Sequence, residues 1–130
     1  AMAGDVLGDA WPEMIVALAR SRGEVVARAV RDLLADCLST LPQLVERANL
    51  PALHFYFATF DGARRQLFPQ ALEAYEHYVC GRVGPLRQVV VEGKTQWMET
   101  ARALLALEPA AREPALAALL EQAGARGVAR

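Results

Sequence analysis

Apolar residues recur along most of the chain at the three- and four-residue spacing of an α-helix. One sustained stripe consists of Val26, Ala29, Val30, Leu33, Cys37 and Leu41. A second consists of Leu86, Val90, Trp97, Ala101, Leu104 and Leu105. The run Val89-Val90-Val91 alone would suggest a strand, but it lies inside this second helical period and has no partner strand elsewhere. The pattern therefore predicts an all-α protein.

Capping residues indicate where the first helices begin. Ser21 and Glu24 match a capping box, which predicts a new helix at this point. However, the apolar stripe continues in register from the preceding segment, so one long helix with a weak point at Gly23 also fits. Both alternatives stay open for residues 12–41. Thr40, two residues before Pro42, predicts the start of a short helix that ends near Asn49.

Proline and glycine residues divide the rest of the chain. Pro51 begins a helix that Asp61-Gly62 ends, Phe68-Pro69 begins another, and Gly84-Pro85 begins the longest one. In the helix after Pro69, the spacing places Leu72, Tyr75 and Val79 inward and Gly81 at the stop. Pro109 and Pro114 are expected to break the chain before a final helix, Ala115 to Ala123.

Short connections favour antiparallel neighbours, so we expect a single-domain antiparallel helical bundle of about six helices. No linker is long enough to separate two domains, and residues 1–130 are expected to form one helical domain. The opening Ala1-Met2-Ala3 suggests a segment excised from a larger protein. Residues 1–8 and 124–130 are expected to be flexible.

An aromatic segment near the middle of the chain is its most distinctive feature. Residues 53–60 hold four of the nine aromatic residues in the chain. In a helix, Leu53, Tyr56, Phe57 and Phe60 share one face, whereas Phe55 points elsewhere. A helix with aromatic residues on more than one side must be covered on more than one side. The segment is therefore expected to be either the hub of a helical core or the wall of a ligand cavity.

Charge and composition exclude several classes of partner. The formal net charge of -1 provides no overall field to attract nucleic acid or an anionic membrane. No apolar run approaches the roughly 20 residues of a membrane span, and no signal peptide is recognisable. Two cysteines, Cys37 and Cys80, are interpreted as buried thiols in a reducing compartment. We expect a cytoplasmic protein.

The sequence offers little support for catalysis, metal binding or a cofactor. His54, His77, Cys37 and Cys80 could in principle supply four metal ligands, but paired Cys-x-x-Cys half-sites are absent. Either histidine could bind haem, although a histidine with one hydrogen-bonded nitrogen in a core or interface is the simpler interpretation. Neither serine nor cysteine has a histidine and a carboxylate at suitable spacing. We expect no enzyme activity, no metal and no cofactor.

A match to a phosphate-binding loop is not retained, and one pair of acidic residues is expected to lie on a solvated surface. Gly93-Lys94-Thr95 matches the end of a phosphate-binding loop, but the glycine required five positions earlier is Gln88. Asp32 and Asp36, with arginines nearby, indicate a solvated, salt-bridged helix face.

A short stretch suggests a regulatory role. Arg65-Gln66-Leu67-Phe68-Pro69, followed by Tyr75 and by Gly84-Pro85, resembles effector-domain helices of TetR-type repressors over about 20 residues of the 130. No helix-turn-helix precedes it, so we assign no family from it. The resemblance implies a sensing domain whose aromatic segment lines a cavity for an apolar ligand, and a haem-type ligand in such a cavity would depend on His54 or His77.

We expect a non-enzymatic helical protein-interaction or dimerisation module of a larger regulatory or scaffold protein. The chain has more large apolar residues than one bundle of this size readily buries, and residual apolar patches usually mark partner surfaces. A protein partner or a homodimer is expected, and the ligand-sensing domain is the alternative. The candidate contact residues for either role are His54, Phe55, Tyr56, Phe57, Phe60, Phe68 and Tyr75.

Overall fold

The described residues of the protein form helices connected by short turns and contain no strand. The structure, a computed structural model, describes the backbone of residues 6–129 and the side chains of residues 6–124. The elements are α2 (Ala10–Ala17), α3 (Arg22–Ala35), the π-helical segment η1 (Asp36–Thr40), α4 (Leu41–Glu46), α5 (Leu50–Ala58), α6 (Gly62–Leu67), α7 (Pro69–Val79), α8 (Gly84–Ala106) and α9 (Pro109–Ala129). The prediction of an all-α fold is confirmed.

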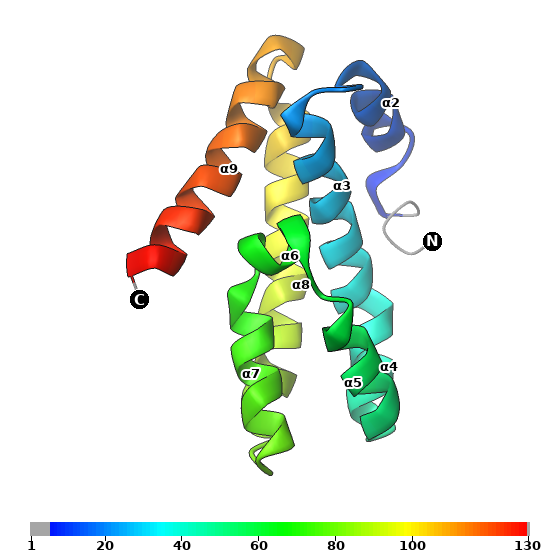
Figure 1. The fold of residues 1–130 in the computed structure, drawn as a ribbon. Coiled ribbons are helices and arrows are strands. Elements are labelled where there is room, and N and C mark those ends of the chain that lie inside the picture. The colour runs from blue at the N-terminus through cyan, green and yellow to red at the C-terminus, as the bar shows by residue number, and fades with distance from the viewer. Residues whose placement is uncertain (1–5, 130) are drawn as a thin grey trace.

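Two long helical runs form the centre of the molecule. Helix α8 rises through the middle of Figure 1, and α3 lies beside it with the opposite chain direction. Helix α7 runs down the lower half of α8, while α9 packs against α3 and α6. The opposite directions of α3 and α7 relative to α8 are compatible with the predicted antiparallel arrangement.

The boundary between α2 and α3 lies at Arg20 and Ser21. Arg20 has a φ of 66°, which ends the first helix, and the Ser21 side chain accepts a hydrogen bond from the backbone N–H of Glu24 at 3.3 Å. The Glu24 carboxylate in turn accepts one from the backbone N–H of Arg20 at 3.1 Å. The capping box therefore separates two helices, and Gly23 is a buried residue of α3.

No break separates α3 from α4. The predicted short helix is present as α4, but Thr40 has helical dihedral angles and makes no side-chain cap, so its predicted capping role is wrong. The backbone instead widens into η1 just before Pro42. A proline cannot donate to the carbonyl four residues earlier and its ring crowds that carbonyl, so a wider turn at this place accommodates Pro42 without ending the helix.

The inward face of α7 matches the predicted one in part, because Leu72 and Tyr75 are half-buried against the core. Ala71 and Ala74 are buried, whereas Val79 is 51% exposed, so its predicted inward position is wrong. The predicted stop is confirmed, because Gly81 has a φ of 91° and the Arg82 N–H donates to the His77 carbonyl at 2.9 Å.

Pro114 does not interrupt the last helix, which already begins at Pro109. Arg112 donates from Nε to the Leu104 carbonyl at 3.2 Å and from Nη2 to the Leu105 carbonyl at 2.9 Å. These bonds hold the first turn of α9 against the end of α8, and Leu116 in the next turn is fully buried. Such contacts outweigh the single backbone hydrogen bond that Pro114 removes.

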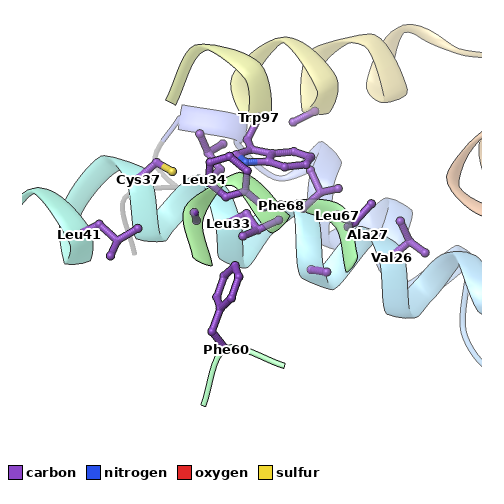
Figure 2. Close-up of a cluster of buried hydrophobic side chains, with 14 of the residues drawn as sticks. Val26, Ala27, Leu33, Leu34, Cys37, Leu41, Phe60, Leu67, Phe68 and Trp97 are labelled. Carbon is purple, nitrogen blue, oxygen red and sulfur yellow. The ribbon is translucent and has the colours of Figure 1, made fainter. Parts of the chain in front are cut away.

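One cluster of buried side chains extends from Leu7 to Ala123. Figure 2 shows Trp97 of α8 and Phe68 lying across α3, with Leu33, Leu34 and Phe60 around them. Both predicted apolar stripes contribute to this cluster. The predicted flexibility of residues 1–8 and 124–130 stays a prediction, and residues 1–5 and 130 lie outside the described residues. Among the described helices, none is both long and apolar enough to cross a membrane.

Candidate functional site

The aromatic segment forms α5 and the turn that follows it. The Asn49 side chain caps the helix by accepting a hydrogen bond from the Ala52 N–H at 3.2 Å. The predicted inward face is confirmed, because it is buried at all four positions, namely Leu53, Tyr56, Phe57 and Phe60. The prediction that Phe55 lies off this face is also confirmed, since Phe55 is 73% exposed.

The buried rings pack mainly against one another and against α7. The Phe57 ring stacks on Tyr75 with centroids 4.3 Å apart, and lies 4.9 Å from Tyr56 and 5.5 Å from Phe60. Phe68 instead meets Trp97 edge-on, with centroids 5.5 Å apart. The structure therefore brings most of the candidate residues together as packing residues, while Phe68 belongs to the centre of the core (Figure 2).

The outer side of α5 is an uncharged surface. Helical geometry places five exposed residues on an arc of about 140°. They are Leu50, Pro51, His54, Phe55 and Ala58, and we call this set the α5 outer face. Helix α5 contains no Asp, Glu, Lys or Arg. On this face, the His54 ring makes a hydrogen bond between its Nδ1 atom and the Tyr75 hydroxyl.

A partly buried polar cluster connects η1, α5 and α6. The Tyr56 hydroxyl donates to Asp36 Oδ2 at 2.6 Å, and Arg64 Nη1 donates to the same oxygen at 3.2 Å. Burial raises the pKa of the Asp36 carboxyl although both hydrogen bonds act to lower it. Burial, followed by the nearby Asp36 charge, also raises the pKa of Tyr56. The expectation of a solvated salt-bridged face is therefore wrong for Asp36.

The histidines and cysteines do not come together. Among the described residues, no group of three or more His, Cys, Asp or Glu side chains is placed to hold a metal ion. Both histidines are exposed, and His77 Nδ1 accepts a hydrogen bond from Arg82 Nε at 2.9 Å. Cys37 is buried and Cys80 is exposed, so the interpretation of two buried thiols is wrong for Cys80.

A groove of about 660 Å³, which no pattern in the sequence predicted, lies between η1, α4 and α8. Its apolar lining consists of Cys37, Leu38, Pro42, Val45, Val90 and Val91. Three charged residues complete it, namely Glu46, Arg87 and Lys94. We call it the η1–α8 groove. No residue of 53–60 lines this groove or either of two smaller ones, of about 440 and 250 Å³.

Gly93 allows α8 to approach η1 at the groove. A Cβ added to Gly93 would lie 2.8 Å from both Cys37 Sγ and Phe68 Cζ, closer than side-chain atoms normally approach. Helix α8 can therefore approach η1 this closely only because Gly93 has no side chain. Burial raises the pKa of the Cys37 thiol to about 12, so this sulfur is a protonated part of the groove floor at neutral pH.

The described residues form an all-α protein in which the outer face of α5 is uncharged and the largest of the three grooves described above lies beside α8. The family model that matches covers residues 1–126 and is described as the C-terminal domain of a family of unknown function, DUF6866. The chain belongs to this family. Neither the curated proteins nor the solved structures contain a match to the chain.

Proposed function

We propose that the chain is a non-enzymatic helical interaction module that self-associates through the α5 outer face. The observation that carries this proposal is the exposure of Phe55, at 73%, on a helix without any charged residue. A surface helix normally presents charged or polar residues to water, whereas a helix that is apolar all round is normally covered. The α5 outer face is therefore a surface suited to a partner.

A second copy of the chain is the partner that fits best. Two uncharged faces meet without like-charge repulsion, and two-fold homodimers are the commonest soluble oligomers. Nine residues of helix span only about 13 Å, less than a standard interface needs. We therefore expect a weak dimer that forms at high micromolar concentration.

The chemistry of the polar groups supports a role without catalysis. The raised pKa values of Cys37 and Tyr56 keep both groups protonated at neutral pH, so neither is a ready nucleophile or base. The matched family model is that of a C-terminal domain, which fits a module that acts within a larger regulatory or scaffold protein. We place that protein in the cytoplasm, because exposed Cys80 suits a reducing compartment.

Sedimentation velocity across a concentration series tests the proposal. We expect the weight-average mass of the wild type to rise with concentration and that of Phe55→Asp to remain monomeric, because a carboxylate would have to be buried in the contact. The matched control is Val16→Asp, since Val16 on α2 is 74% exposed. Circular dichroism checks that both variants are folded.

Two results would overturn self-association through α5. One is a wild type that stays monomeric at every concentration. The other is a Phe55→Asp variant that associates as strongly as the wild type, which would place the contact elsewhere.

A further inference from the structure

We propose that the η1–α8 groove is a binding site for a carboxylate with a medium-length alkyl chain. The alkyl chain would lie along the valines of α8, and the carboxylate would bind the ammonium group of Lys94. This site shares no residue with the α5 outer face, so the inference goes beyond self-association.

The size and lining of the groove suit an alkyl chain. Its volume of about 660 Å³ falls within the range of small-molecule sites, which are mostly apolar with a few polar groups at defined places. Val90 is nearly buried at 6% exposure and forms part of the floor, whereas Val91 is 68% exposed. A bound alkyl chain would cover the exposed valine and gain apolar contact with both.

The two cations of the groove lack partners within α8. Arg87 and Lys94 form no ion pair or side-chain hydrogen bond with another described residue. The positions three and four residues away on α8 carry no carboxylate for either residue. The groove lining holds two cations and one carboxylate, Glu46, so its excess positive charge favours an anionic ligand over a cationic one.

The chain directions distinguish the two cations. Gly93 is level with Cys37, and α8 runs opposite to α3 and η1 (Figure 1). Glu46, nine residues after Cys37, therefore lies toward the Arg87 end of the groove, where it offsets the arginine charge. Lys94 at the other end has no carboxylate of the groove beside it. A single anionic head group is thus best placed at Lys94.

The spacing of the cations indicates the length of the ligand. Seven residues of α-helix separate Arg87 from Lys94, a rise of about 10 Å. A medium-length alkyl chain anchored at Lys94 can extend over Val90 and Val91 along this distance. Binding is reversible and non-covalent, because an unactivated carboxylate does not react with the buried thiol of Cys37 in the floor.

Calorimetric titration of the whole chain with sodium decanoate, below its micelle concentration, tests the proposal. We expect saturable binding of one decanoate, weakened about fivefold by Lys94→Gln, since an exposed charge-assisted contact contributes modestly. The matched control is Arg102→Gln, which removes an exposed cation from α8 outside the groove. Decyltrimethylammonium, with the same alkyl chain and the opposite charge, should bind more weakly than decanoate.

A second pair of variants tests the apolar part of the site. Val91→Asp introduces a carboxylate beside the alkyl chain and should abolish decanoate binding. Val25→Asp on α3, where Val25 is 58% exposed and outside the groove, should leave it unchanged. Because Lys94 is the only lysine of the chain, ¹³C-methylation yields one lysine signal, which should shift on titration.

The outcomes separate this inference from self-association. It is overturned if decanoate does not bind, if decyltrimethylammonium binds equally well, or if Lys94→Gln binds decanoate like Arg102→Gln. Phe55→Asp should retain the decanoate affinity of the wild type, so a failure of the α5 contact leaves the groove result unaffected.

Discussion

Phe55 and Phe57 lie two residues apart on α5 but have opposite environments. Phe57 is 6% exposed and stacks on Tyr75, whereas Phe55 is 73% exposed. We expect Phe57→Ala to lower the free energy of unfolding by about 3–5 kcal/mol, because it removes apolar burial and leaves a cavity. Phe55→Ala should change it by no more than about 0.5 kcal/mol. Urea denaturation at low protein concentration measures both.

Equal losses in these two variants would contradict the assignment of Phe57 to the core and of Phe55 to the surface. If both losses were small, the packing around Tyr75 would not contribute as described. The comparison is informative because the two substitutions remove the same atoms from the same helix.

The raised pKa of the Cys37 thiol, which is also a property of a single residue, makes the stability of the fold depend on pH in alkaline solution. The folded state holds the thiol proton up to a pKa of about 12, against an ordinary value of 9.0 in the unfolded chain. Unfolding therefore releases a proton between these values, and stability falls with rising pH by up to about 1.4 kcal/mol per pH unit. Well below pH 9 the thiol is protonated in both the folded and the unfolded state and contributes no pH dependence.

Urea denaturation of the wild type and of Cys37→Ala at several pH values from 8 to 11 measures this effect. The variant will be less stable throughout, but its stability should fall less steeply with pH. Parallel pH profiles would show that the Cys37 thiol titrates equally in both states. Exposed Cys80 should react with a thiol reagent in the folded protein, while Cys37 should react only after unfolding.

At the scale of elements, the contact between α8 and η1 depends on Gly93. Gly93→Ala should gain about 1 kcal/mol in helix propensity but lose about 1–3 kcal/mol, because the new Cβ would meet Cys37 Sγ and Phe68 Cζ at 2.8 Å. Since the Phe68 ring and the short Cys37 side chain cannot easily move aside, we expect net destabilisation. Thermal unfolding measures it.

Gly84→Ala is the control for this substitution. Gly84 begins the same helix. Apart from its chain neighbours and the nearby backbone of its own helix, no atom lies within 4 Å of a Cβ added there. We expect its melting temperature to equal or exceed that of the wild type. A stabilised Gly93→Ala variant would contradict the close packing of α8 against η1.

Element boundaries set by local chemistry could be predicted from the sequence, and those set by distant contacts could not. Ser21 and Gly81 act through hydrogen bonds with residues at most five positions away, so their roles are visible in a short stretch of sequence. Pro114 sits inside α9 because Arg112 and Leu116 contact distant parts of the chain. Thr40 lies within a continuous helical run, in which the wider turn of η1 accommodates Pro42 without a break. Residue patterns do not reveal such a wider turn.

The candidate sites also differ in whether they could be predicted from the sequence. The exposure of Phe55 follows from the 3.6-residue period, and the sequence predicted it. The η1–α8 groove depends on the approach of two segments about 50 residues apart, and only the folded chain brings Cys37 level with Gly93. The partners of Asp36 were missed for the same reason, because Tyr56 and Arg64 come from other helices.

At the scale of the whole molecule, the continuous core predicts a single cooperative unfolding transition. One cluster of buried side chains includes Trp11 of α2, Trp97 of α8 and Leu116 of α9. An element cannot detach without exposing part of this shared cluster, so we expect two-state behaviour, as in most domains of this size. Both Trp Nε1 atoms are buried without a described hydrogen-bond partner, and Trp→Phe therefore removes no hydrogen bond.

Trp11→Phe and Trp97→Phe each leave one tryptophan as a local fluorescent probe in a different part of the molecule. For each variant, the melting temperature from tryptophan fluorescence should coincide with that from far-ultraviolet circular dichroism. If α2 unfolded separately from the α3–α8 centre, Trp11 fluorescence would change at a lower temperature than helix content. The chain would then consist of two cooperative units, and the α2 contacts with α3 and α8 would be too weak to couple them.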